Sequence, residues 1–405
     1  EMGDPVEIGV ELDRIHRPQM DVKMIVMVLL FSIGGMVLQY IVGGYAPMGG
    51  SNGSSVYLSQ LGRQGLILLI SFGVMAGMYF LDYSFIGRYA TAIYWGMTIV
   101  FFTIRIMSGE INGRYPVMLM LVYLYVPAYA GLLYQLRGRG YGAVVKGIAI
   151  QVLTAGAAYY LSNILHAALA VYLMQMVLLL LAVRKGWFEV NKRDATIVIV
   201  TVLVIIPLAA CLFLLVTGPA EADNYRLRRI QAWLHPSEDP YGAGYTYMWI
   251  RQGLAKSKLI GVYEGFSFDD EITWLVPRTD PFILIEIVFT FGILIGILVV
   301  AALAALIIHA FGIVRRQKNQ LGFMISAACF MVFLDNCLEG VLINTGCFPV
   351  TSVQLPFLSY GVGSTVTYAV FIGLLLSIHR NEKIVTDYTV TGRPVWRLNI
   401  RLEKK

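Results

Sequence analysis

The sequence predicts an all-α membrane protein with about ten transmembrane helices and a large extracytoplasmic loop between the seventh and eighth helices. Of its 405 residues, 58% are hydrophobic and only 14% are charged, whereas soluble domains carry about 25% charged residues. Ten apolar runs are long enough for a bilayer core of about 30 Å, which needs roughly 20 residues per helix. This composition excludes a soluble cytoplasmic enzyme, a secreted disulfide scaffold and a disordered chain.

The apolar runs are expected to be helices, because backbone groups inside a bilayer must form hydrogen bonds within the segment itself. The runs are, in chain order, residues 24–44, 65–81, 85–102, 115–134, 144–161, 165–183, 195–216, 281–310, 321–342 and 355–378. The third and fifth runs are the weakest, since Tyr, Thr and Gly residues dilute them. Together the runs predict a membrane domain over residues 24–378, with cytoplasmic tails at 1–23 and 379–405.

The charges of the connecting loops support the count of ten. Lys and Arg residues recur in both tails and after the fourth, sixth and eighth runs, whereas loop 343–354 has none. With ten spans, all the basic segments lie on one side, which the positive-inside rule assigns to the cytoplasm. We therefore expect both termini to be cytoplasmic. The net charge of +6 is then a topology signal, and we expect no nucleic-acid partner.

The loop between the seventh and eighth runs, residues 217–280, is the longest connection of the chain. Loops of this length are usually functional or disordered. Its aromatic residues and apolar pairs lead us to expect an ordered loop that rests on the membrane face.

The four cysteines show no spacing typical of a metal site or a disulfide framework. They are Cys211, Cys329, Cys337 and Cys347, and three of them stand in apolar runs. We therefore predict that they are small buried hydrophobic residues.

Asp280 ends the long loop, in the stretch Trp274-Leu-Val-Pro-Arg-Thr-Asp280. A partly desolvated carboxylate at a membrane edge can have a raised pKa and act as a general base. Arg278, two residues before it, is a suitable ligand for a phosphate. Asp280 followed by Pro281 also fits the start of a helix, with Asp280 as the cap. The catalytic and capping roles are compatible.

Arg226, Arg228 and Arg229 form a basic cluster early in the long loop, followed by Trp233. This pattern is typical of an amphipathic segment at the level of the lipid headgroups. The guanidinium groups are suited to binding a pyrophosphate, although nonspecific attraction to anionic lipid explains them equally well.

Asp335 and Glu339 are two acids within the ninth run. They are four residues apart and therefore share a helix face. Acids inside a membrane span are costly and usually face the bundle interior or a cavity. Both a proton or cation path and a structural contact between helices are compatible with this pattern.

Ser359, Tyr360 and Gly361 precede the last helix, after a segment that Pro349 and Pro356 bracket. Small residues let a helix or a ligand approach closely, so these three residues are candidates for substrate binding. A re-entrant loop packed against neighbouring helices is the alternative.

Three motifs in the same order resemble the SEDS proteins, the FtsW, RodA and SpoVE group. Leu355-Pro-Phe-Leu-Ser-Tyr-Gly361 is similar to their Leu-Pro-Phe-Ile-Ser-Tyr-Gly. His235-Pro-Ser-Glu-Asp-Pro-Tyr-Gly-Ala-Gly-Tyr245 is similar to their Asn-Pro-x-x-Asp-Pro-x-Gly-x-Gly-Tyr. Thr279-Asp280 stands where the family has His-Thr-Asp-Phe. The resemblance covers about residues 15–385.

This resemblance implies a ten-helix SEDS-type bundle in the bacterial cytoplasmic (inner) membrane. The implied activity is that of a peptidoglycan glycosyltransferase, which polymerises lipid II in division, elongation or sporulation. Asp280 would be the essential carboxylate that activates the acceptor hydroxyl. The leaving undecaprenyl pyrophosphate would need Arg side chains or a divalent cation, Mg²⁺ or Mn²⁺. The implied partner is a class B penicillin-binding protein, a single-span transpeptidase.

The chain departs from the family pattern at two charged motifs. The family's Gln-Pro-Ser-Glu-x-x-Lys is replaced by Tyr115-Pro-Val-Met-Leu-Met-Leu121, and its Gly-Glu-Glu by a stretch ending in Phe291-Gly292. A non-catalytic scaffold that binds lipid II or a transpeptidase is therefore the alternative function. A lipid-linked precursor flippase that uses Asp335 and Glu339 is a third hypothesis.

Overall fold

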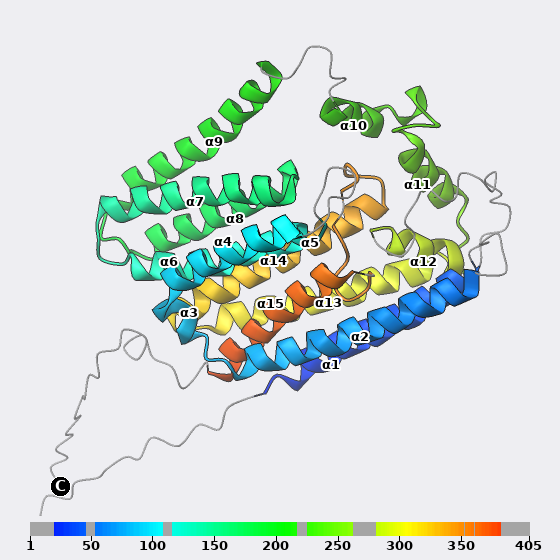
Figure 1. Cartoon of the computed structure of the whole chain (residues 1–405), viewed down its shortest axis with the longest axis horizontal. Coiled ribbons are helices and arrows are strands. Elements are labelled where there is room, and N and C mark those ends of the chain that lie inside the picture. The colour runs from blue at the N-terminus through cyan, green and yellow to red at the C-terminus, as the bar shows by residue number, and fades with distance from the viewer. Residues whose placement is uncertain are drawn as a thin grey trace, which may run out of the picture.

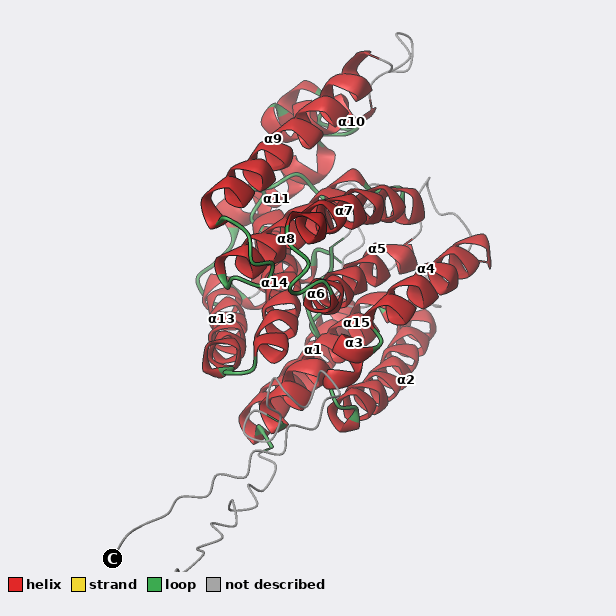
Figure 2. Cartoon of the chain, turned by 90° about the vertical axis from the view of Figure 1, so that its left-hand side faces the viewer, coloured by secondary structure: helices red, strands yellow, loops and turns green. Residues whose placement is uncertain are grey.

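The computed structural model is helical throughout the residues that it describes, with no strand among them (Figures 1 and 2). It describes residues 20–45, 53–107, 116–216, 225–261, 281–351, 353–359 and 361–381. Only the backbone is described for residues 42–45, 53–60, 116–117, 207, 210–216 and 225–229.

Each of the ten predicted runs contains at least part of a helix. The long helices are α1 (Val22–Tyr45), α2 (Gly53–Phe80), α4 (Ala90–Met107), α7 (Tyr141–Ser162), α8 (Leu165–Arg184), α9 (Lys192–Val216), α13 (Ile293–Arg316), α14 (Gln320–Asn344) and α15 (Val362–Arg380). The fourth run forms α5 (Pro116–Leu121), η1 (Val122–Leu124) and α6 (Tyr125–Gln135). In the described chain, nine helical segments are long and apolar enough to cross a membrane. The protein is therefore a multi-pass membrane protein, and α9 lies where the seventh span was predicted.

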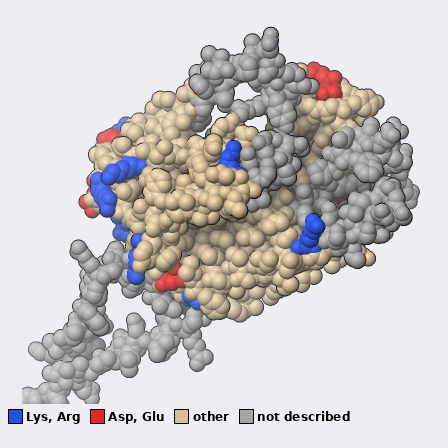
Figure 3. All heavy atoms as spheres, viewed as in Figure 1, with Lys and Arg blue, Asp and Glu red and all other residues tan. Residues whose placement is uncertain are grey.

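The core of the bundle lies between α6, α8, α14 and α15, whose residues are mostly buried. Helix α2 packs along α15, and α7 packs along α8. Helices α1, α4 and α13 expose much of their apolar surface, as expected for helices that face lipid. On the face seen in Figure 3, a wide region without charged side chains lies over the middle of the bundle.

Helices α10 (Tyr225–Leu234) and α11 (Tyr245–Lys256), with the short turn η2 (Pro236–Glu238), come from the long loop. They lie together at one end of the bundle (Figure 1), which we call the loop end. The opposite end, where α1 begins and α15 ends, is the tail end. Residues 217–224 and 262–280 of the loop lie outside the described chain, so an ordered loop that rests on the membrane face stays a prediction.

The fourth span is interrupted by the 3-10 turn η1. Pro127 explains this position, because it has no N–H group for the carbonyl of Tyr123, four residues earlier. The helix tightens there into a 3-10 turn, and Tyr125 N–H donates to the carbonyls of Val122 and Tyr123. Tyr123 and Tyr125 are both fully buried in the core.

The eighth span is two helices, so the prediction of one continuous run over residues 281–310 is wrong. Helix α12 (Ile283–Phe291) ends at Gly292, whose φ of 98° starts a new direction for α13. Residues 257–261 of the long loop cross this break and supply its hydrogen bonds. Gly261 N–H donates to Phe291 O at 3.0 Å, and Ile293 N–H donates to Lys258 O at 3.0 Å.

Two other predicted spans begin later than expected. The last helix starts at Val362 rather than at residue 355, because the preceding residues form an irregular segment. The third span is α4, which starts at Ala90 after the separate turn α3 (Ser84–Arg88).

One cysteine prediction is wrong. Cys329 and Cys337 are buried as expected, but Cys347 is exposed because it lies in the turn that follows α14. The side chain of Cys211 lies outside the described part.

Candidate functional site

Several of the predicted site residues lie outside the described chain. These are Arg278, Asp280 and Tyr360. Arg226, Arg228 and Arg229 belong to α10, of which only the backbone is described there. The roles proposed for these six residues stay predictions. The structure does describe residues that neighbour them in the sequence, and the contacts of those residues.

Asn344, the last residue of α14, holds the start of α12. Its amide nitrogen donates to Pro281 O and to Gly340 O, both at 2.7 Å. Its carbonyl oxygen accepts from Ile285 N–H at 3.0 Å. Asn344 is almost completely buried, so these bonds are shielded from water. The residue that follows Asp280 is therefore fixed to α14 by a side chain to which the sequence alone assigned no role.

A small second core joins the long loop to α12. It is separate from the main core of the bundle and consists of Tyr245, Trp249, Ile250, Phe282, Ile285 and Ile343. The ring of Trp249 lies edge-on to Phe282 and Phe289, with centroid distances of 6.0 and 5.2 Å. Aromatic pairs in this geometry are stabilising beyond the area they bury. Helix α11 is thus packed directly on α12.

The motif between α10 and α11 forms a compact turn. Asp239 accepts a hydrogen bond from Ala243 N–H at 2.9 Å. A Cβ at Gly244 would overlap the carbonyl oxygen of Pro236, so only glycine fits this position. The acid and the glycine of the motif therefore have structural roles in building the turn.

The long loop also binds the segment after α14. Trp233 Nε1–H donates to Gly346 O at 3.2 Å, and Val350 N–H donates to the Tyr247 hydroxyl at 2.8 Å. Arg251 donates to Trp233 O at 3.2 Å. These bonds place α10 and α11 against residues 346–350.

Ser359 and Gly361 are described, and both are buried. The Ser359 hydroxyl accepts from Leu355 N–H at 3.1 Å, and a Cβ at Gly361 would overlap the Gln354 side chain. The Gln354 carbonyl in turn accepts from the Tyr368 hydroxyl at 2.8 Å. This geometry indicates that the two residues stabilise the segment before α15, and contact with a substrate stays a prediction.

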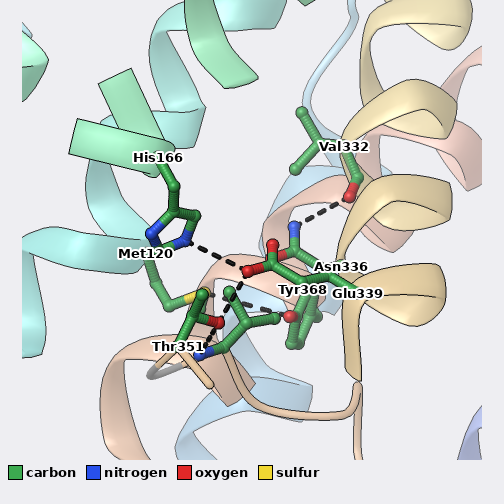
Figure 4. A network of polar contacts seen from close by, with 8 residues as sticks. Met120, His166, Val332, Asn336, Glu339, Thr351 and Tyr368 are labelled. Carbon is green, nitrogen blue, oxygen red and sulfur yellow. Dashed lines mark hydrogen bonds and ion pairs between the residues drawn. The ribbon is translucent and has the colours of Figure 1, made fainter. Parts of the chain in front are cut away.

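Glu339 connects three elements at the loop end (Figure 4). Its Oε1 atom accepts from the Thr351 hydroxyl at 2.6 Å and lies 3.3 Å from Nε2 of His166, at the start of α8. Sequence analysis missed His166, because nothing in the local sequence links it to an acid so far along the chain.

Within the described ranges, no group of three or more His, Cys, Asp or Glu residues is arranged to hold a metal ion. The expected divalent cation therefore has no described ligand set. Its binding stays a prediction.

A sequence model of the FtsW, RodA and SpoVE family, described as Cell cycle protein, matches residues 120–384. Stage V sporulation protein E of Bacillus subtilis is 27% identical over 159 residues, 39% of this chain and 43% of that protein. Peptidoglycan glycosyltransferase MrdB of Escherichia coli is 26% identical over 164 residues, 40% of this chain and 44% of that protein. The matches thus span less than half the length of these relatives.

Solved structures show the same fold. A chain described under "Structural coordination of polymerization and crosslinking by a peptidoglycan synthase complex" has a TM-score of 0.66 and 19% identity, and the match covers 90% of this chain and 99% of that one. Thermus thermophilus Rod shape determining protein RodA has a TM-score of 0.54 and 16% identity, over 90% of this chain and 98% of that one. The family model covers well over half of the sequence, and the chain therefore belongs to the FtsW, RodA and SpoVE family.

Proposed function

We propose that this protein is a peptidoglycan glycosyltransferase that polymerises lipid II into glycan strands, with Asp280 as its essential carboxylate. Family membership supports the reaction class, since relatives such as MrdB carry the name peptidoglycan glycosyltransferase. The observation that carries the proposal is the position of Asp280 in the chain. It directly precedes Pro281, which Asn344 holds against α14.

In the proposed reaction, Asp280 accepts the proton of the acceptor sugar hydroxyl as its oxygen attacks the anomeric carbon of the donor. The new glycosidic bond forms while the bond to the pyrophosphate breaks, and undecaprenyl pyrophosphate leaves. Arg278, Arg226, Arg228 and Arg229 would neutralise the charge of this leaving group. A bound divalent cation, Mg²⁺ or Mn²⁺, would supply further positive charge.

The proposed setting is the bacterial cytoplasmic membrane, with both termini in the cytoplasm and the loop end outside. The basic loops support this orientation through the positive-inside rule. The proposed partner is a class B penicillin-binding protein, a single-span transpeptidase. The similarity to a chain described as part of a peptidoglycan synthase complex supports such a partner.

A second candidate function is a non-catalytic scaffold that binds lipid II or recruits the transpeptidase. Helix α5 favours it, because Met118 and Leu121 occupy the positions at which the resemblance implies an acid and a lysine. Met118 is fully buried among apolar neighbours, so no charge is supplied from that side chain.

The two functions are separated by polymerisation of purified lipid II in the presence of the cognate transpeptidase. The glycosyltransferase proposal requires glycan strands with the wild type and a severe loss with Asp280→Asn. Binding of lipid II or of the transpeptidase without any glycan product would instead establish the scaffold.

A further inference from the structure

Residues 353–359 form an irregular, mostly buried segment before α15, which we call the connecting segment. Side chains of two helices bind its backbone. Gln39 of α1 donates through Nε2 to Leu358 O at 2.6 Å, and the Tyr368 hydroxyl of α15 donates to Gln354 O at 2.8 Å. Buried backbone groups outside regular helices need partners of this kind.

A third helix, α14, holds the start of the connecting segment through Glu339. Its Oε1 atom accepts from the Thr351 hydroxyl at 2.6 Å, and Thr351 Oγ1 accepts from Val353 N–H at 3.4 Å. Figure 4 shows Thr351 and His166 converging on the Glu339 carboxyl group, so α8 supports the same contact. Glu339 is only 9% exposed, and a buried group that loses its partner is costly to leave unsatisfied.

The connecting segment also lies against the turn of α14 that fixes the residue after Asp280. A Cβ added at Gly340 would lie 2.6 Å from Leu355 Cδ2, so Leu355 packs directly on the helix backbone there. The Gly340 carbonyl accepts from Asn344, which also donates to Pro281 O. One turn of α14 therefore contacts both the connecting segment and the anchor of Pro281.

Phe357, within the connecting segment, has a strained backbone with a φ of 61°, which a bulky residue rarely adopts. Such strain persists only where the surrounding structure imposes it, and it is concentrated at active sites and ligand-binding sites. The Phe357 ring packs on Tyr368 with a centroid distance of 6.0 Å. A Cβ at Gly35 would lie 2.7 Å from Phe357 O. Helices α1 and α15 thus impose this conformation.

We propose that the connecting segment is a preorganised binding element for the lipid-linked substrate, and that Gln39, Glu339 and Thr351 are its positioning residues. The identity of the substrate, lipid II, rests on the proposed function. Ser359 ends the segment, so a candidate for substrate contact is part of it. The positioning residues act through the backbone of the segment. Because preorganisation contributes to affinity, loss of one of them should weaken substrate binding more than it slows the chemical step.

The test compares the binding of fluorescently labelled lipid II by the purified full-length wild type, Thr351→Val and Thr351→Ser in detergent. Valine keeps the shape of threonine without its hydroxyl, whereas serine keeps the hydroxyl. We expect the Kd to rise by about tenfold in Thr351→Val and to stay close to the wild-type value in Thr351→Ser. In the polymerisation assay, the KM of Thr351→Val should rise by a larger factor than its kcat falls.

Two further variants complete the comparison. Gln39→Leu removes the bond from α1 and should also weaken lipid II binding, and it provides the test if Thr351→Val does not fold. Thr103→Val is the matched control, because Thr103 is exposed on α4 and its hydroxyl donates to Ile99 O of its own helix. This control should bind lipid II like the wild type.

Wild-type affinity in both Thr351→Val and Gln39→Leu would overturn the inference. An equal loss in Thr351→Ser and Thr351→Val, or a fall in kcat without a change in affinity, would do the same. A wild type that binds lipid II but forms no glycan strands would overturn the proposed function alone, and the affinities of the variants would still test the inference. A wild type with no affinity for lipid II would overturn both.

Discussion

The Asn344 amide donates to the carbonyl oxygen of Pro281 at 2.7 Å, so the end of α14 fixes the residue that follows Asp280. The same side chain accepts from Ile285 N–H in the first turn of α12. One buried asparagine thus sets both the position and the start of α12. Any function of Asp280 depends on this anchoring, because Asp280 is covalently joined to Pro281.

Replacing Asn344 by leucine should weaken both stability and activity. Leucine keeps a similar volume but leaves the Ile285 N–H and the Pro281 carbonyl without partners, which costs about 1–3 kcal/mol for each buried group. In the lipid II assay, we expect kcat to fall by about tenfold or more with a smaller change in KM, because a displaced catalytic group costs rate.

The neighbouring Thr345→Ala serves as the control, since Thr345 is exposed and bonds only its own helix end. It should leave melting and polymerisation close to those of the wild type. If the thermal midpoint and the kcat of Asn344→Leu equalled those of the wild type, the anchoring role of Asn344 would be refuted.

Gly292→Ala should destabilise the break between α12 and α13. The φ of 98° at Gly292 is strained for any residue with a side chain. A Cβ there would also lie 2.6 Å from Leu259 O and 2.7 Å from the Cα of Ile260. Backbone strain of this kind costs about 1–3 kcal/mol, and we expect a corresponding fall in the thermal midpoint.

The matched control for this variant is Gly77→Ala, in the last turn of α2. No atom lies within 4 Å of its added Cβ, and alanine is the better helix former. Its midpoint should stay level or rise. Equal thermal midpoints for Gly292→Ala and Gly77→Ala would show that the packing of residues 257–261 across the break does not require glycine at position 292.

Asp21 should make stability depend on acidic pH at the tail end of the bundle. Burial raises the pKa of Asp21, but hydrogen bonds from Met24 N–H and His309 outweigh it and hold the pKa below the ordinary 3.8. Because the folded-state pKa is lowered, the stabilisation is complete above the unfolded-state value. It is lost as the pH falls through the folded-state pKa.

Thermal midpoints of the wild type and Asp21→Asn between pH 6 and pH 3 measure this contribution. The wild type should be the more stable protein at pH 6, and the difference should shrink toward pH 3. A difference that stays constant over this range would show that ionisation of Asp21 does not stabilise the fold.

The helical class and the positions of the spans were predictable from the sequence, because apolar length alone decides where a chain can cross a bilayer. The shared face of Asp335 and Glu339 followed from helix geometry in the same way. The break at Gly292 was not predictable, since residues 281–310 are mostly apolar and no proline or polar cluster marks position 292. Its hydrogen bonds come from residues 258–261 of the preceding loop, and only the folded chain brings them together.

The candidate site was predictable to a smaller extent. Motif spacing singled out Asp280 and the turn before α11, but the partners that position them come from distant segments. Asn344 and His166 are examples, because each makes its contact with a residue far away in the sequence. Ser359 and Gly361 were candidates for substrate binding because they belong to the last motif. Their described contacts are with residues of their own loop.

The most direct test of the central claim is the rate of lipid II polymerisation by wild-type protein and by Asp280→Asn, each with its transpeptidase. Co-purification of the transpeptidase with both proteins controls for folding. A general base contributes about 10²–10⁴-fold to a rate, so we predict a loss of at least about 100-fold in the variant with unchanged partner binding. Equal rates of glycan formation by the two proteins would contradict the assignment of Asp280 as the essential carboxylate.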